Sequence, residues 1–338
     1  MTLERRIARS IALIATSMLL TSSATALTDA FFFGASFTDS GNTVTATDLY
    51  GQSTTGTCGG LTTPYVGGAC SNGPVWAEVF ASELGVSAEP ATAGGTNYAV
   101  GGATAIPDFI ASHIGEVDGD TEDFLDQVGR FDADHALGAD PGALYVISFG
   151  GNDINFSEAG RGPGYTPLTG TIGDLAAAAA DAVIDTVLAL SALGAQDFLL
   201  FEAPGFEVAP DFAGGLYAGN IAAYVSAYNA ALAAGVSALS GPNITIFDMD
   251  PTLDDMLANP ASYGLVNTTD SCESNPLCWL SPATADGYLW FDGVHPTQTA
   301  HEAIGLAAAA VVPEPTTALL LGLGLTGLAV RRGRARAA

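Results

Sequence analysis

The sequence contains no lysine, and its nine basic residues are all arginine. Seven of those arginines lie within the first nine or the last eight residues, so residues 27–312 hold two arginines against 34 acidic residues. A body this acidic repels the phosphates of nucleic acids and the surface of an anionic membrane, and we expect neither as a partner. We interpret the charge itself as a source of solubility.

Long hydrophobic runs are also missing from the N-terminus, where Ile11 to Leu20 is too short to span a bilayer comfortably. Three arginines precede this run, and Ala24-Thr25-Ala26 follows it. A positive start, a short apolar stretch and an A-x-A site predict a secretory signal peptide over residues 1–26. An uncleaved anchor is the alternative.

The C-terminus, residues 312–338, has three parts in order. Val312-Pro313-Glu314-Pro315 precedes the apolar stretch Thr316 to Val330, and an arginine cluster ends at Arg336. The positive-inside rule keeps that cluster in the cytoplasm and the body outside. The arrangement resembles the PEP-CTERM sorting tail of Gram-negative bacteria. This resemblance implies an exosortase-type processing enzyme as partner, transient membrane anchoring, and delivery to the periplasm, the cell envelope or the extracellular matrix. An ordinary C-terminal anchor is the alternative, and it would also export the body.

Cysteine is scarce, and its four occurrences, Cys58, Cys70, Cys272 and Cys278, include no C-x-x-C spacing that would indicate zinc. Four cysteines allow three pairings. The local bridges Cys58–Cys70 and Cys272–Cys278 are the simplest of these. Two disulfides would fit an oxidising compartment outside the cytoplasm.

The body, residues 27–311, has no repeat of 20 to 50 residues and no Pro/Ser-rich linker, which predicts one domain. Apolar, strand-like runs alternate with helical patterns, and this alternation is typical of a parallel sheet covered by helices on both faces. The predicted strands are Ala30 to Gly34, Thr96 to Val100, Leu144 to Phe149, Phe198 to Phe201 and Ile244 to Phe247, and the predicted helices are Pro74 to Leu84, Ile172 to Leu193, Leu216 to Leu239 and Thr297 to Ala310.

Two long segments, Thr43 to Asn72 and Ser271 to Asp286, are rich in loop-forming residues, and each contains one of the local cysteine pairs. Loops of this length in a compact domain are usually functional or cross-linked. The acidic run Glu116 to Asp126 lacks the ligand order of an EF-hand. We expect it to be a solvated acidic surface.

Four polar, glycine-rich segments fall at or near strand ends, where open parallel sheets bind their ligands. They are Phe33 to Asn42, Asn97 to Ala103, Gly150 to Asp153 and Phe291 to Thr297. Taken singly, each is an ordinary loop or turn. Taken as an ordered set, they predict a catalytic site.

These segments contain the parts of a nucleophilic serine mechanism. Ser36 needs an adjacent base, and His295 can supply it if the carboxylate of Asp292, three residues earlier, orients the imidazole. An acyl-transfer intermediate also needs donors for its oxyanion. The backbone N–H groups of Ser36 and Gly102 and the side-chain amide of Asn152 are the candidates. His113, His135 and His301 have no such neighbours, and we expect them to be surface, core or helix residues.

The four segments resemble the blocks of the GDSL/SGNH hydrolase family, in the order in which that family carries them. Residues 33–42 resemble its nucleophile block FGDSLSDxGN, Asn152 its GxND block and the pair Asp292 and His295 its DxxH block, while Gly102, or Gly101 beside it, takes the place of its second-block glycine. Asn72 to Trp76 is similar to a segment of the lipase/haemolysin-like branch. The resemblance implies a three-layer α/β/α sandwich with a mostly parallel sheet. It also implies a serine esterase or lipase that uses no metal and no cofactor.

One position departs from the family pattern: Ala35 stands where the family has an aspartate that supports the nucleophile loop. The neighbouring carboxylate, Asp39, is a candidate for part of that support. Ala35 also keeps open a different class of function, a non-catalytic matrix or adhesion protein. Within the enzymatic interpretation the substrate is either a lipid acyl ester or an acetylated polysaccharide, the latter making the protein an O-deacetylase.

Overall fold

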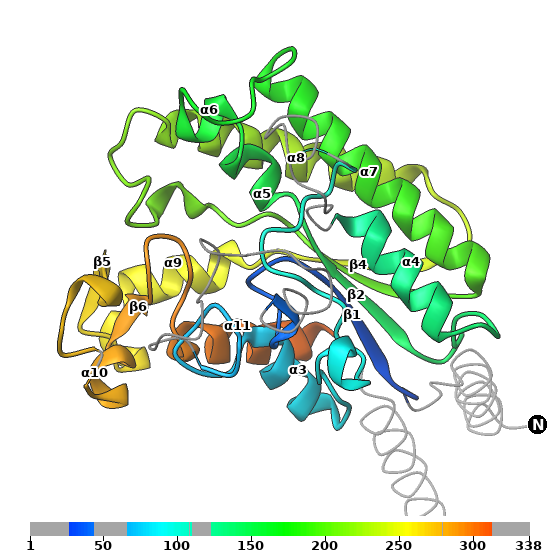
Figure 1. Cartoon of the computed structure of the whole chain (residues 1–338), viewed down its shortest axis with the longest axis horizontal. Coiled ribbons are helices and arrows are strands. Elements are labelled where there is room, and N and C mark those ends of the chain that lie inside the picture. Colours follow the sequence, from blue (N-terminus) through cyan, green and yellow to red (C-terminus); the bar gives the residue numbers. More distant parts are fainter. Residues whose placement is uncertain (1–26, 44–65, 108, 110–122, 279, 313–338) are drawn as a thin grey trace, which may run out of the picture. The chain divides into compact units, whose positions relative to one another are not determined.

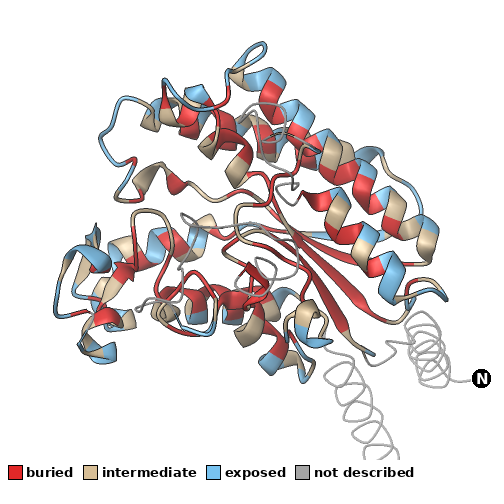
Figure 2. Ribbon diagram, in the orientation of Figure 1, coloured by how far each residue is buried: buried red, intermediate tan, exposed pale blue. Residues whose placement is uncertain are grey.

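The computed structural model describes residues 27–43, 66–107, 109, 123–278 and 280–312, and within them four parallel strands form the main sheet (Figure 1). The strands lie in the order of the sequence: β1 (Ala30–Gly34), β2 (Leu144–Ser148), β3 (Asp197–Phe201) and β4 (Asn243–Phe247). β1, β2 and β3 are buried along nearly their whole length (Figure 2). A strand that is buried on both faces needs a continuous apolar sequence, as these three strands have.

The fifth predicted strand, Thr96 to Val100, is not a regular strand. The segment nevertheless runs parallel beside β1, because Tyr98 N–H donates to Phe32 O (2.8 Å), Val100 N–H donates to Gly34 O (3.1 Å) and Phe32 N–H donates to Thr96 O (3.0 Å). The chain therefore leaves β1 on the side away from β2. The direction of winding reverses at β1, which makes its carboxyl end a topological switch point.

Helices cover the sheet on both sides, which gives the predicted three layers (Figure 1). One layer holds α4, α7 and α8 and continues into the short α5 and α6, whereas α3, α9 and α11 lie on the other side. The bounds are α3 Trp76–Leu84, α4 Phe124–Asp134, α5 Gly151–Asn155, α6 Glu158–Arg161, α7 Ile172–Leu193, α8 Ala218–Ala238, α9 Asp250–Ala258, α10 Pro282–Ala285 and α11 Gln298–Val311, with 3-10 turns η1 Ala91–Ala93, η2 Phe206–Val208, η3 Pro260–Tyr263 and η4 Cys272–Ser274.

Helices α7 and α8 are each long and apolar enough to cross a membrane. They pack against each other and over the sheet instead, and their alanines and small side chains allow a close approach. We therefore interpret both as core helices of the α/β/α sandwich. At the start of α7, the side chain of Thr171 caps the helix by accepting from Asp174 N–H.

The segment Ser271 to Asp286, predicted as a loop, contains η4 and α10 and lies between two further strands. These strands, β5 (Asn267–Ser271) and β6 (Tyr288–Trp290), form a separate two-stranded sheet. Cys272 and Cys278 form a disulfide here, with 5.8 Å between their Cα atoms. Cys70 is also disulfide-bonded, and its predicted partner Cys58 lies outside the described residues.

The acidic run differs from the expectation of a solvated surface at its C-terminal end. Asp123 is buried and caps α4, its carboxylate accepting from Asp126 N–H at 3.1 Å. A carboxylate at the start of a helix satisfies amides that the helix itself leaves unpaired. Residues 110–122 lie outside the described part of the chain, as do the predicted signal peptide and all of the predicted tail beyond residue 312.

Candidate active site

The candidate nucleophile Ser36 lies two residues beyond β1, at the switch point. Its loop turns at once, because the carbonyl of Ala35 accepts from the backbone N–H groups of Thr38 (2.9 Å) and Asp39 (3.0 Å). Gln127 on α4 holds both backbone groups of Gly34: its Oε1 accepts Gly34 N–H (3.0 Å) and its Nε2 donates to Gly34 O (2.8 Å). Ser36 is buried apart from 8% of its surface.

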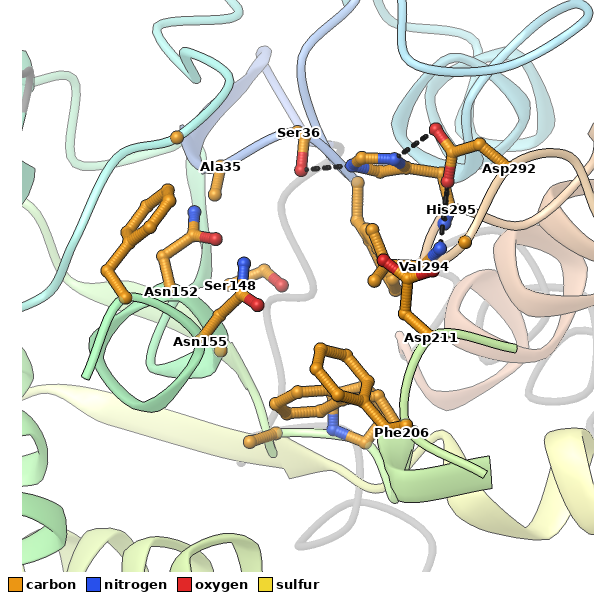
Figure 3. A pocket seen from close by; sticks show the side chains of 18 of the residues that line it. Ala35, Ser36, Ser148, Asn152, Asn155, Phe206, Asp211, Asp292, Val294 and His295 are labelled. Carbon is orange, nitrogen blue, oxygen red and sulfur yellow. Dashed lines mark hydrogen bonds and ion pairs between the residues drawn. The ribbon is translucent and has the colours of Figure 1, made fainter. Parts of the chain in front are cut away.

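Ser36, His295 and Asp292 lie in one line of hydrogen bonds, although 259 residues separate the serine from the histidine (Figure 3). Ser36 Oγ is 2.8 Å from His295 Nε2, and His295 Nδ1 is 2.7 Å from Asp292 Oδ2. A carboxylate only accepts, so Nδ1 carries the proton and Nε2 is left to accept from the serine hydroxyl. This geometry is consistent with a catalytic serine–histidine pair.

Asp292 is held as an anion by its surroundings. Burial alone would raise the pKa of its carboxyl, but the neighbouring His295, the ring hydrogen bond and the backbone N–H groups of Val294 and His295 together lower that pKa to about 2. The two N–H groups donate to Asp292 Oδ1 at 2.8 and 2.7 Å. The turn of residues 292–295 thus fixes both carboxylate oxygens.

Asp39 supports the loop that carries Ser36. Its buried carboxylate accepts the backbone N–H groups of Gly41 (2.8 Å), Asn42 (2.6 Å), Thr43 (3.0 Å) and Gly101 (3.0 Å), as well as the hydroxyl of Thr43. Burial raises the pKa of Asp39, and these hydrogen bonds work in the opposite direction. The loop around Ser36 is therefore ordered without a carboxylate at position 35.

The candidate oxyanion donors are not equivalent. Gly101 N–H already donates to Asp39 Oδ2 (3.0 Å) and Thr43 Oγ1 (2.6 Å), which leaves Gly102 as the better candidate. Gly102 lines the cavity beside Ser36 and has φ = +87°, a conformation that favours glycine. The side-chain amide of Asn152, on α5, donates one hydrogen to Ala103 O (2.9 Å), and its second hydrogen is available to a ligand.

A cavity of about 460 Å³ opens in front of Ser36. Figure 3 shows Asn152 on one side of the serine and His295 on the other, with the ring of Phe206 farther into the cavity. The apolar part of the lining is formed mainly by side chains that follow the ends of the four strands. These are Phe37, Phe149, Phe156, Phe206, Phe212 and Met249, and Val294, beyond β6, adds to them.

The other two histidines in the described part of the chain, His135 and His301, take structural positions. His301 is buried on α11, and its Nδ1 accepts from Trp76 N–H (3.2 Å), so its proton is on Nε2. Burial, with a smaller contribution from His295, lowers the pKa of His301 to about 3. His135 ends α4, and His113 lies outside the described residues.

Sequence reasoning assigned no role to several residues that hold the site together. Asn42 joins the nucleophile loop to the segment beside β1 through Nδ2, which donates to Asn97 O (2.7 Å) and Ala99 O (2.8 Å). Gln127 lies on a helix that the sequence did not predict. Asp211 lines the cavity, and its N–H donates to Gly293 O (2.9 Å). These partners are far apart in the sequence, so although Asn42 closes a recognisable block, its contacts could not be read from the sequence, and no local pattern marks Gln127 or Asp211.

Comparison with known families agrees with this geometry. Residues 31–308 match the model of the GDSL-like Lipase/Acylhydrolase family, a range that runs from β1 to α11 and contains every candidate site residue. The chain belongs to this family. Residues 311–334 match the PEP-CTERM protein-sorting motif, which indicates export and sorting to the cell surface.

Relatives of this GDSL-family chain include esterases and lipases. It is 30% identical to Esterase EstA of Pseudomonas aeruginosa over 245 residues, 67% of this chain and 36% of EstA. It is 24% identical to the phosphatidylcholine-sterol acyltransferase of Aeromonas hydrophila, over 74% of this chain and 82% of that protein. This chain therefore spans about a third of EstA. An acetylxylan esterase from Geobacillus stearothermophilus is similar in structure with a TM-score of 0.39 and 15% identity, over 82% of this chain and 91% of the esterase.

Proposed function

We propose that this protein is an exported serine hydrolase that cleaves carboxylic esters through an acyl-enzyme. The observation that supports this most directly is the pair of short contacts at His295, 2.8 Å to Ser36 Oγ and 2.7 Å to Asp292 Oδ2, at the wall of a cavity. An isolated Ser–His contact has many structural uses. A contact with a carboxylate behind it and oxyanion donors in front of it is an arrangement for acyl transfer.

In the proposed first step Ser36 Oγ attacks the ester carbonyl carbon while His295 Nε2 takes the hydroxyl proton. Asp292 stabilises the imidazolium that forms, and the negative charge on the former carbonyl oxygen is bound by Ser36 N–H, Gly102 N–H and the Asn152 amide. His295 then gives its proton to the leaving alcohol as the C–O bond breaks. Water, deprotonated by His295, releases the acid and restores Ser36.

The decisive experiment is Ser36→Ala in the full chain. We expect turnover of p-nitrophenyl esters to fall at least 10³-fold, as is usual when a nucleophile is removed, with an unchanged circular dichroism spectrum and melting temperature. A fluorophosphonate probe should label the wild type and not the variant. Retained turnover in the variant would remove Ser36 from the mechanism, and a wild type that does not label would favour a non-catalytic matrix or adhesion protein.

Two substrate classes are compatible with this mechanism, lipid acyl esters and acetylated polysaccharides. The cavity of about 460 Å³ has room for more than an acetyl group. A series of p-nitrophenyl esters from acetate to palmitate, measured beside acetylated xylan, separates the two. Activity that rises with chain length identifies a lipase-like enzyme, whereas activity confined to acetate and the polysaccharide identifies an O-deacetylase.

The final location belongs to the same proposal. We expect an exosortase-type enzyme to cut the tail near Pro313-Glu314-Pro315 after transient anchoring, so that the body reaches the envelope or matrix of a Gram-negative cell. Replacing these three residues by alanine should keep the protein at its full exported length in the membrane fraction. Normal shortening of that variant would contradict the proposal.

A further inference from the structure

The charges that line the cavity are mostly negative. Four carboxylates, of Glu202, Asp211, Glu273 and Asp292, line it together with one guanidinium, that of Arg161. Arg161 Nη1 lies 3.3 Å from Asp211 Oδ2, so these two charges largely cancel. Asp292 serves His295. Glu202 and Glu273 thus dominate the potential that a substrate meets in the part of the cavity that the structure describes.

Glu273 is fixed next to the candidate catalytic turn. It follows Cys272, whose disulfide to Cys278 closes the loop, and its N–H donates to Phe291 O at 2.8 Å, one residue before Asp292. Burial raises the pKa of the Glu273 carboxyl, and the charges of Asp292 and Asp211 raise it further, whereas His295 lowers it. Glu273 and His295 line the same cavity, and the Glu273 backbone is bonded to the residue that precedes Asp292.

The position of Glu273 corresponds to the alcohol side of the ester. The base that deprotonates Ser36 also hands that proton to the leaving alcohol, so the alcohol oxygen must lie near His295 Nε2. Asn152 lies on the opposite side of Ser36 (Figure 3). A group attached to the alcohol oxygen therefore extends into the half of the cavity that contains His295 and Glu273.

Glu202 adds a second carboxylate from an independent element. It directly follows β3, at the carboxyl edge of the sheet, and its side chain makes no hydrogen bond or ion pair with another described residue. Burial raises the pKa of Glu202, and Asp248 and Asp250 raise it further. A partly desolvated carboxylate on a cavity wall attracts a cation and repels an anion.

We infer, on the basis of the proposed function, that the preferred ester carries a positive charge on its alcohol part, in the form of an ammonium group. Glu273 and Glu202 determine this preference by stabilising the cation and by raising the free energy of any bound anion. Phenylalanine rings such as Phe206 offer faces that suit the alkyl groups of a quaternary ammonium. Anionic esters are selected against for the same electrostatic reason.

The test compares two esters of one shape. Acetylthiocholine and 3,3-dimethylbutyl thioacetate differ by a quaternary nitrogen in place of a quaternary carbon, and each releases a thiol that can be measured. For the full wild-type chain at low salt we expect kcat/KM to be about tenfold higher for the cationic ester, through KM, because one charge pair at partly exposed sites supplies that order of energy. Sodium chloride at 0.5 M should shrink the ratio.

Variants assign the effect to residues. Glu273→Gln and Glu202→Gln should each lower the cationic-to-neutral ratio several-fold, and the exposed Glu83→Gln on α3 should leave it unchanged. A wild-type ratio of one or less overturns the inference, and so does a ratio that neither cavity variant lowers. Turnover of the neutral ester alone preserves the esterase proposal while the charge inference fails. Absence of turnover of both the cationic and the neutral ester by the wild type would instead refute the proposed function.

Discussion

Asp39 Oδ2 accepts the backbone N–H of Gly101, a residue 62 positions farther along the chain, at 3.0 Å. This bond joins the loop that carries Ser36 to the turn that presents Gly102. Ser36, the candidate nucleophile, and Gly102, a candidate oxyanion donor, are therefore positioned by the same carboxylate. The bond also withdraws Gly101 from competition for the oxyanion.

Asp39→Asn is expected to disturb both stability and catalysis. An amide offers one acceptor oxygen in place of two, so backbone N–H groups that are now paired become buried without partners. This should cost about 2–4 kcal/mol of unfolding free energy and lower kcat at least tenfold. Urea unfolding and ester kinetics would measure the two effects, with the exposed Asp185→Asn on α7 as control. Wild-type kcat in Asp39→Asn would show that the turn is held by other means.

Asn152 and Asn155 form a matched pair on α5, since both line the cavity. The amide of Asn152 faces the proposed oxyanion position, whereas Asn155 Oδ1 accepts from Arg161 Nε at 2.7 Å. We expect Asn152→Ala to lower kcat by about 10²–10³ with little change in KM, and Asn155→Ala to lower it less than tenfold. Equal losses would mean that the helix, and not the Asn152 amide, matters to the transition state.

His301 gives a prediction for the pH dependence of stability. Its pKa is about 3 in the folded protein against 6.5 as the ordinary value. Between these values the unfolded chain binds a proton that the folded chain does not, so this residue makes the unfolding free energy fall as pH decreases, by about 1.4 kcal/mol per unit.

His301→Asn should flatten that dependence. Asparagine can still accept from Trp76 N–H, but it does not titrate. The carboxylates are common to both proteins, so subtracting the two stability curves from pH 7 to pH 4 isolates the histidine. Parallel curves would contradict a buried, neutral His301.

The disulfide supplies a fourth prediction. Replacing Cys272 and Cys278 together by serine opens a loop with a sequence separation of six. We expect a loss of about 2 kcal/mol from the chain-entropy estimate and a rise in KM, because Glu273 and the turn beyond β6 lose their restraint. The measurements are thermal unfolding and steady-state kinetics under non-reducing conditions. An unchanged KM would separate the loop from substrate binding.

Much of the fold was predictable because buried parallel strands need continuous apolar sequence. The apolar runs that begin at Leu144 and Phe198 are typical of buried strands. The predicted bounds of the four main strands agree with the observed bounds to within one or two residues. Helix α4 was missed because its solvent-facing acids masked a buried side that includes Phe124, Gln127 and Phe131. Strand β5, Asn267–Ser271, is polar and, among the described residues, pairs with β6 alone, so no alternation marked it.

For the site, the sequence predicted which residues come together but not what holds them. Ser36, Asp292 and His295 lie in recognisable blocks. Gly101 and Gly102 could not be separated from the sequence, because the difference lies in a hydrogen bond to a distant carboxylate. The roles of Gln127 and Glu273 likewise depend on contacts that exist only after the chain has folded.

The small β5–β6 sheet shares no strand with the main sheet, yet it leads through η4 and β6 into the turn that carries Asp292 and His295. The candidate nucleophile Ser36 and the candidate oxyanion donors are anchored by the main sheet, whereas Glu273 and the turn of Asp292 and His295 are reached through the small one. Substitutions in the segment between β5 and β6 can therefore alter the surroundings of Glu273 while the strand that presents Ser36 stays unchanged.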